Sequence, residues 1–297
     1  MIQAETDALE ERLSRAIEAY HEATLLYAAV KRGLPQAMGA GSWTAVDLAR
    51  ALGLSAPHLR RFLRGLCLVG ICDERASGSY ALTSFGQSLT PESHLAQKVR
   101  IVFEQYWQPW SKLDATLQSG TPAFAEVFGA NVFAWRRDHP EQGALFASYL
   151  AKQTQAEAEA IHAALDTREA GRVIEIAGAD DAVLAGKPPQ ADLYVLRGVL
   201  QNYDEADAAA ILCNCRAAMA DGARLVIIER LMPERAADDP TSIMLDLHMM
   251  TITGGRLRTL AEIETLLSAA GLSRQGAKRM ACGLSVIEAV KPASSQR

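Results

Sequence analysis

Residues 191–200 read ADLYVLRGVL, and their central LYVL run is apolar throughout rather than at every second residue. Two similar runs flank it, RVIEIAG at 172–178 and ARLVIIERL at 223–231. Short runs of this kind are typical of parallel strands that are covered on both faces. A final pair of strands is expected near 275–279 and 284–290, with helices between the earlier strands. The second half of the chain therefore predicts an α/β fold.

The first 95 residues predict an N-terminal domain of helices with a small hairpin. Residues 4–32 carry apolar side chains at spacings of three and four residues, which is the pattern of an amphipathic helix. Two capped helices follow, over 45–52 and 55–70, and then a hairpin over 71–83. This order of elements predicts an all-α domain of the winged-helix type.

A winged helix can bind DNA, and Arg60, Arg61 and Arg64 would then lie near phosphates. Residues 1–95 contain 9 Lys and Arg against 10 Asp and Glu, so the basic surface of a DNA-binding domain is missing. The net charge of the whole chain is −5. We therefore expect no nucleic-acid partner.

The middle of the chain is rich in aromatic residues between 103 and 146. Aromatic residues at this density usually form a core, and in a segment that connects two domains they also line ligand clefts. We expect three parts: a winged-helix domain over 1–95, a helical connector over 96–166 and an α/β domain over 167–297. Aromatic residues of the connector are assigned to a substrate pocket: Trp107, Phe128, Phe133 and Trp135.

Composition excludes several classes of protein. At 297 residues and 49% hydrophobic, the chain can bury a substantial core. It has acidic residues from Glu5 onward, no apolar leader and no stretch near the ~20 apolar residues of a membrane span, so we expect a cytoplasmic protein without membrane contact. Five scattered cysteines do not form a disulfide framework, and no cluster of His, Cys, Asp and Glu predicts a metal site.

Four motifs occur in a fixed order: TAVDLARALGLSAPHLRRFLRGLCLVGI at 44–71, ADLYVLRGVLQNYDE at 191–205, ARLVIIERLMP at 223–233 and DLHMMTITGGRLRT at 246–259. Together they resemble the cation-independent O-methyltransferase family of the caffeic-acid and hydroxyneurosporene type, over nearly the whole chain. The resemblance implies a winged-helix domain that forms homodimers, a Rossmann-like domain that binds S-adenosylmethionine, and a small-molecule substrate.

The cofactor site that the resemblance implies is reduced in this sequence. Where the family has alternating glycines after the first strand, the chain reads Ala177, Gly178 and Ala179, although the acidic Glu175 is kept. Only twelve residues, 180–191, separate this turn from the next strand, about fifty fewer than the family pattern implies. We therefore expect a truncated Rossmann-like sheet that lacks about two strands, vestigial contacts at Glu175 and Gly178, and no cofactor.

The resemblance also implies a histidine base oriented by two glutamates. These three positions hold Gln201, Glu229 and Leu257, and a neutral amide cannot take a proton from a phenol. The DLHMM segment faces the substrate in the family. We take as catalytic candidates Glu229, His248, Gln201 and Arg197, and we add Met249 to the pocket.

Three functional hypotheses follow. The first is a cofactor-independent cyclase, isomerase or lyase of small-molecule biosynthesis, with Glu229 as acid or base. The second is a non-catalytic partner, either a homodimer or a heterodimer with a complete methyltransferase. The third is an S-adenosylmethionine-dependent O-methyltransferase with an atypical cofactor site. The sequence alone favours the first.

Overall fold

The structure is a computed structural model, and the residues it describes are 2–165, 170–177, 186 and 188–292. The chain divides into two compact units, which are described separately: Met1–Trp107 with Ala144–Tyr149, and Gln108–Gly143 with Leu150–Arg297. The expected connector over 96–166 contributes to both units. None of the described helices is long and apolar enough to cross a membrane.

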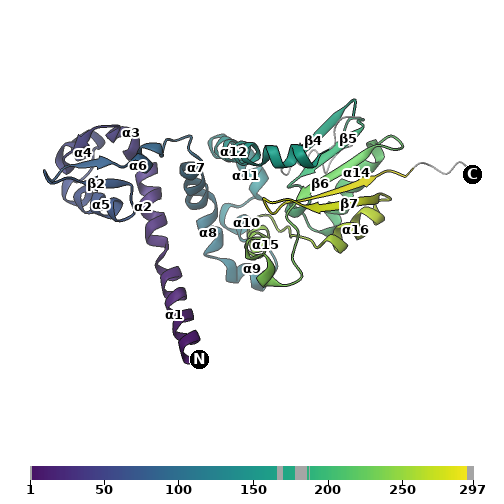
Figure 1. Cartoon of the computed structure of the whole chain (residues 1–297), viewed down its shortest axis with the longest axis horizontal. Coiled ribbons are helices and arrows are strands. Elements are labelled where there is room, and N and C mark those ends of the chain that lie inside the picture. Colours follow the sequence, from purple (N-terminus) through teal and green to yellow (C-terminus); the bar gives the residue numbers. More distant parts are fainter. Residues whose placement is uncertain (1, 166–169, 178–185, 187, 293–297) are drawn as a thin grey trace, which may run out of the picture. The chain divides into compact units, whose positions relative to one another are not determined.

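The first unit is mainly helical and has one small sheet (Figure 1). The sheet has three antiparallel strands in the order β1-β3-β2. The elements of this unit are α1 (Ile2–Glu18), α2 (Tyr20–Lys31), α3 (Leu34–Met38), β1 (Ser42–Trp43), α4 (Ala45–Leu52), α5 (Ala56–Leu68), β2 (Cys72–Glu74), β3 (Tyr80–Leu82), α6 (Ser84–Ser88), α7 (His94–Ile101) and the π-helical turn η1 (Val102–Tyr106).

Local capping explains why α4 has the bounds that the sequence predicts. The Thr44 side chain accepts a hydrogen bond from the backbone N–H of Asp47, which fixes the start of the helix. Gly53 ends it in the left-handed conformation, which a residue with a Cβ rarely adopts. The helix expected over 4–32 is interrupted at Ala19, between α1 and α2.

The second unit contains the larger sheet. The unit boundaries fall within α8 (Trp107–Trp110) and α12 (Pro140–Ala164). Its other elements are α9 (Leu113–Ser119), α10 (Ala123–Phe128), α11 (Val132–Asp138), β4 (Val173–Ala177), β5 (Leu193–Arg197), the 3-10 turn η2 (Leu200–Asn202), α14 (Glu205–Ala218), β6 (Arg224–Glu229), the 3-10 turn η3 (Ala236–Asp238), α15 (Pro240–Ile252), α16 (Leu260–Ala269), β7 (Ser273–Arg279) and β8 (Ser285–Val290).

The described strands of this sheet lie in the order β4-β5-β6-β8-β7. The first three are parallel: Val173 pairs with Leu193, and Leu193 with Arg224. β8 runs antiparallel to both β6 and β7, so the sheet is mixed. Because β4, β5 and β6 are parallel and in register, their carboxyl ends meet at one edge.

Both faces of the central strands are covered, as their apolar runs predict. Alternate residues such as Tyr194 and Leu196 pack with α14 and α16, while Leu193 and Val195 pack on the other side with Ile161 of α12. β4 is less covered than the central strands, and its apolar residue Val173 is exposed. The core therefore lies around β5 and β6.

The core of the first unit offers a test on one helix. On α5, Leu63 is fully buried and Leu68 is 87% exposed. Leu63→Ala should lower the free energy of unfolding by about 2–5 kcal/mol, because it leaves a cavity. Leu68→Ala is the control and should stay within about 0.5 kcal/mol. Urea titration of both variants measures the difference, and equal losses would contradict this packing.

Candidate functional site

The candidate site lies where the carboxyl ends of the parallel strands meet. Ligands of open α/β sheets bind at this edge. β5 is followed here by Gly198, which has a positive φ of 58°, and by the turn η2. The side chain of Asn202 donates hydrogen bonds to the carbonyl oxygens of Gly198, at 2.8 Å, and Val199, at 3.2 Å. Asp204 then caps α14, so the segment 198–204 is a closed turn with Gln201 at its centre.

Glu229, the last residue of β6, faces the amide side of this turn. Its side chain is 3% exposed, and Oε1 accepts a hydrogen bond of 3.2 Å from the backbone N–H of Gln201. Burial raises the pKa of Glu229 to about 7, against the opposing effects of the backbone amides of residues 199–201 and of the Arg258 charge. The structure thus brings Gln201 and Glu229 together, through the backbone of one and the carboxyl group of the other.

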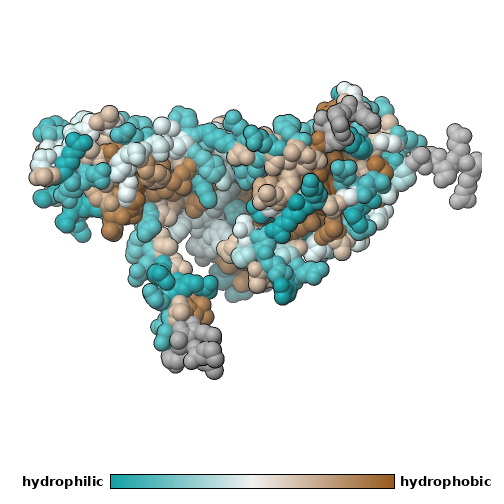
Figure 2. Space-filling model, in the orientation of Figure 1, coloured by the Kyte–Doolittle hydropathy of each residue, from teal (hydrophilic) through white to brown (hydrophobic). Residues whose placement is uncertain are grey.

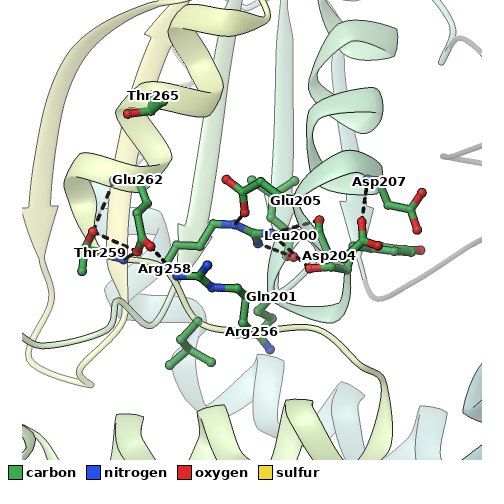
Figure 3. A network of polar contacts seen from close by, with 12 residues as sticks. Leu200, Gln201, Asp204, Glu205, Asp207, Arg256, Arg258, Thr259, Glu262 and Thr265 are labelled. Atoms are coloured by element: carbon green, nitrogen blue, oxygen red, sulfur yellow. Dashed lines mark hydrogen bonds and ion pairs between the residues drawn. The ribbon is translucent and has the colours of Figure 1, made fainter. Parts of the chain in front are cut away.

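Arg258 faces the carbonyl side of the same turn. Its guanidinium group donates to the carbonyl oxygens of Leu200, Tyr203 and Asp204 at 2.8–3.1 Å, and its Nε donates to the exposed carboxylate of Glu205 at 3.1 Å. Figure 3 shows the side chain reaching from the segment before α16 to the start of α14. This arginine lies in the GGRLRT motif at 254–259, and no local pattern there predicts its role.

Gly255 packs directly on the turn. A Cβ at this position would overlap the carbonyl oxygen of Gln201 and would lie 2.7 Å from the Cα of Asn202. The segment 253–259 therefore contacts the turn in two places, at Gly255 and at Arg258. A glycine here is required by the close approach of two backbone segments.

Arg197, another candidate, forms an ion pair. Its Nη2 lies 2.6 Å from Oε2 of Glu157 on α12, and Nη1 donates to the hydroxyl group of Thr154. Its Nε is buried and has no hydrogen-bond partner among the described residues. The contacts of this guanidinium group tie α12 to the end of β5.

His248, on α15, is held as a neutral ring. The indole N–H of Trp110 donates to its Nδ1 at 3.1 Å, so a proton on the neutral ring must sit on Nε2. Burial, with a smaller effect from the charge of Arg136, lowers the pKa of His248 to about 4. A neutral histidine in this tautomer can donate a hydrogen bond through Nε2. The role of Trp110 was not predicted, because it lies 138 residues from His248 in the sequence.

The predicted aromatic residues fall into separate groups. Phe128 and Trp135 pack together with Phe124, at ring distances of 4.6–5.6 Å, and form an internal cluster. Phe133 stacks with Tyr203 of the turn at 6.4 Å. Trp107 is the last residue of the first unit's 1–107 segment and stacks with Phe103 at 5.0 Å. Met249 is buried and follows His248 in the sequence of α15.

The predicted cofactor residues lie at β4. Glu175 is exposed on this strand, two residues before its end, whereas Gly178 lies outside the described residues. Asp192 precedes β5, at the other end of the strands, and accepts a hydrogen bond of 2.8 Å from the backbone N–H of Arg172. Among the described residues no group of three or more His, Cys, Asp and Glu could hold a metal ion.

Known proteins similar to this chain in sequence and in structure are methyltransferases. Residues 184–273 match the family model of the O-methyltransferase domain. The O-demethylpuromycin-O-methyltransferase of Streptomyces alboniger is 29% identical, over 88% of this chain and 83% of that protein. The crystal structure of LaPhzM superposes with a TM-score of 0.85 at 27% identity, covering 96% of this chain and 99% of that one. Other relatives are also named O- or N-methyltransferases.

A third similar protein was crystallised with its ligands. The O-methyltransferase NcsB1 from neocarzinostatin biosynthesis, in complex with S-adenosyl-L-homocysteine and 1,4-dihydroxy-2-naphthoic acid, superposes with a TM-score of 0.76. It covers 93% of this chain and 98% of that one at 24% identity, which shows the fold alone. The chain thus has a methyltransferase fold with an N-terminal helical domain and a mixed sheet.

These findings correct two expectations. The hypothesis of a cofactor-independent cyclase, isomerase or lyase is wrong, because the relatives along nearly the whole chain are named methyltransferases. The expectation of no cofactor is also wrong, because similar methyltransferases were crystallised with S-adenosyl-L-homocysteine, among them CalO1 of calicheamicin biosynthesis, at 26% identity and a TM-score of 0.67. S-adenosylmethionine is therefore the expected cofactor. The superposition with LaPhzM covers 96% of this chain, and this coverage does not by itself show the expected truncation of the sheet.

The burial of Glu229 predicts a pH dependence of stability. Its pKa is raised from 4.5 to about 7, so the folded protein holds a proton that the unfolded chain releases in this window. The free energy of unfolding should therefore fall as the pH rises from about 4.5 to about 7, by up to about 3 kcal/mol. Glu229→Gln should remove this part of the slope.

Urea unfolding of the wild type and the variant from about pH 5 to about pH 8 measures the difference. Glu234→Gln, at an exposed carboxylate, is the control for loss of one charge. Identical slopes in the wild type and Glu229→Gln would contradict a raised pKa at this position.

Proposed function

We propose that this protein is an S-adenosylmethionine-dependent methyltransferase of small aromatic molecules in natural-product biosynthesis, with an atypical cofactor site. The observation that carries the proposal is the similarity of nearly the whole chain to named methyltransferases, in sequence and in fold. The closed turn after β5 supports it, since this turn lies at the edge of the sheet where α/β enzymes bind their ligands.

The described residues fit S-adenosylmethionine at one position. Glu175 is an exposed carboxylate near the carboxyl end of β4, and a carboxylate suits the ammonium group of the cofactor's amino-acid part. Asp192 does not, because it lies at the opposite end of the strands and binds the backbone of Arg172. When bound, the cofactor would supply the methyl group. Gly178, the other predicted contact, lies outside the described residues.

The atypical site rests on a difference in length. The alignment with the Streptomyces alboniger protein runs over 314 positions but includes only 88% of this chain, about 261 residues, so about 50 positions have no residue here. We place this gap between β4 and β5, because these strands are direct neighbours and only residues 178–192 separate them. The sheet would then be about two strands shorter than that of a relative.

On the acceptor side, the proposal gives each candidate a role that its contacts allow. Gln201 would hydrogen-bond to the methyl acceptor, while Glu229 holds its backbone. His248 would donate from Nε2 to an oxygen of the substrate. Arg197, paired with Glu157, would position α12 against β5. The pocket is proposed to include the predicted residues of the second unit, Phe133, Phe128, Trp135 and Met249.

The first unit is proposed to act as a winged-helix dimerisation domain. Large apolar side chains are exposed along α1 and the start of α2, and Figure 2 shows hydrophobic residues among hydrophilic ones on the helix that leads to the N-terminus. An exposed apolar row on one helix is typical of a surface that a partner covers. Its members are Leu9, Leu13, Ile17 and Tyr20. A second copy of this chain is the partner we propose.

Binding of S-adenosylmethionine tests the proposed activity directly. Calorimetry should give a micromolar Kd, and transfer of a labelled methyl group should be seen with a panel of hydroxylated and aminated aromatic acids. Glu175→Gln should weaken cofactor binding about tenfold or more, because a charge-assisted hydrogen bond is lost. Asp192→Asn, at the other end of the strands, is the matched control and should bind normally. No saturable binding by the wild type would overturn the proposal.

Light scattering tests the dimer. The wild type should have twice the chain mass of 32.0 kDa, and the double variant Leu13→Glu with Ile17→Glu should have the mass of one chain, because two charges would be buried unpaired. Leu117→Glu, at an exposed apolar residue of the second unit, should remain a dimer. A monomeric wild type would contradict the proposal.

A further inference from the structure

The turn that carries Gln201 is held by buried polar groups rather than by apolar packing alone. Its carbonyl oxygens at Leu200, Tyr203 and Asp204 lie between the end of β5 and the start of α14. Backbone N–H groups satisfy only part of their capacity: Tyr203 donates to Leu200 at 3.2 Å and Ala208 of α14 donates to Asp204 at 3.0 Å, while each carbonyl oxygen has two lone pairs. Buried carbonyl groups without donors are costly. All three accept from one side chain, that of Arg258.

Arg258 is suited to this task by its geometry. It is 1% exposed, the largest side chain among those fully buried in the described residues. A guanidinium group has five donors in a fixed plane, and four bonds from this one are observed, to Leu200, Tyr203, Asp204 and Glu205. A lysine has a single nitrogen and cannot reach acceptors that are spread along the turn in the same way.

The turn is constrained from three directions. Arg258 holds its carbonyl groups, the carboxyl group of Glu229 accepts from the amide of Gln201, and Gly255 contacts the Gln201 and Asn202 backbone. The positive charge of Arg258 also offsets part of the rise that burial causes in the pKa of Glu229. These groups come from segments far apart in the sequence. Together these contacts restrain the Gln201 backbone from three sides.

The segment that carries Arg258 is itself fixed. Thr259 and Glu262 form a reciprocal capping box at the start of α16, and Arg256 pairs with the same glutamate (Figure 3). Leu257 donates its backbone N–H to Asp246 at 2.7 Å. The backbone on both sides of Arg258 is therefore fixed, so the guanidinium group holds its hydrogen-bond acceptors in the turn at a defined position.

We infer that Arg258 is a positioning residue of the methyltransferase site: its guanidinium group fixes the 198–204 turn and thereby sets the place of the Gln201 side chain relative to the methyl acceptor. The catalytic part of this inference rests on the proposed function. The structural part, that Arg258 orders the turn, does not.

Hydrogen–deuterium exchange tests the structural part without any ligand. In Arg258→Lys, which keeps the charge but loses the planar fork, amides of residues 199–205 should exchange at least about tenfold faster, because about three charge-assisted hydrogen bonds are lost. Amides of α4 and α5 in the first unit should be unchanged. Gly255→Ala should accelerate the same peptide by displacing the turn from its other side. Unchanged exchange at 199–205 in Arg258→Lys would overturn the inference.

Steady-state kinetics test the catalytic part. Arg258→Lys should lower kcat at least about tenfold while the Kd for S-adenosylmethionine changes less than about threefold, because the turn and not the cofactor contact is altered. Glu205→Gln removes only the exposed partner and should have a smaller effect. Arg235→Lys, at an exposed surface pair, is the control. Equal losses in kcat and cofactor affinity would indicate general unfolding and contradict a positioning role.

If the wild type binds no cofactor, the proposed function fails, and the exchange experiment still decides the role of Arg258.

Discussion

The parallel pairing of β5 with both β4 and β6 is the constraint on which the site depends. It brings the ends of three strands to one edge of the sheet and places Glu175, Arg197 and Glu229 on neighbouring strands. The pairing holds because the apolar residues of β5 and β6 are covered on one face by α14 and α16 and on the other by α12. The turn after β5 shares part of this core through Val199, Leu200 and Tyr203, and buried polar groups hold its backbone in addition.

The two buried ionisable groups, Glu229 and Arg258, bind opposite kinds of backbone group in the turn. The carboxyl group of Glu229 faces backbone N–H groups, and the guanidinium group of Arg258 faces backbone carbonyl groups. Each buried ionisable group is thus matched to the dipoles beside it, which reduces the cost of removing it from water. The match is incomplete for Glu229, whose pKa remains raised to about 7. A site held in this way depends on individual residues rather than on overall hydrophobicity.

Much of the fold could be predicted from sequence, because its signals are local. Thr44 and Gly53 define α4, and the continuous apolar runs define β5 and β6. The site was harder, because its contacts join distant segments: Arg258 lies more than fifty residues from Leu200, and Trp110 lies 138 residues from His248. The spacing of apolar residues along the sequence does not indicate which distant side chains will be in contact. The wrong functional hypothesis rested on three local departures: the glycines replaced at Ala177 and Ala179, the short segment after β4 and the missing histidine at Gln201. The similarity of nearly the whole chain to named methyltransferases contradicts it.

The central claim is that a methyltransferase cofactor binds at the carboxyl edge of β4 and β5 although the segment between these strands is short. The most direct test is a crystal structure of the protein grown with S-adenosyl-L-homocysteine. The account predicts ligand density at this edge, in contact with Glu175 of β4. Density elsewhere on the protein, or an empty edge at a saturating ligand concentration, would contradict it.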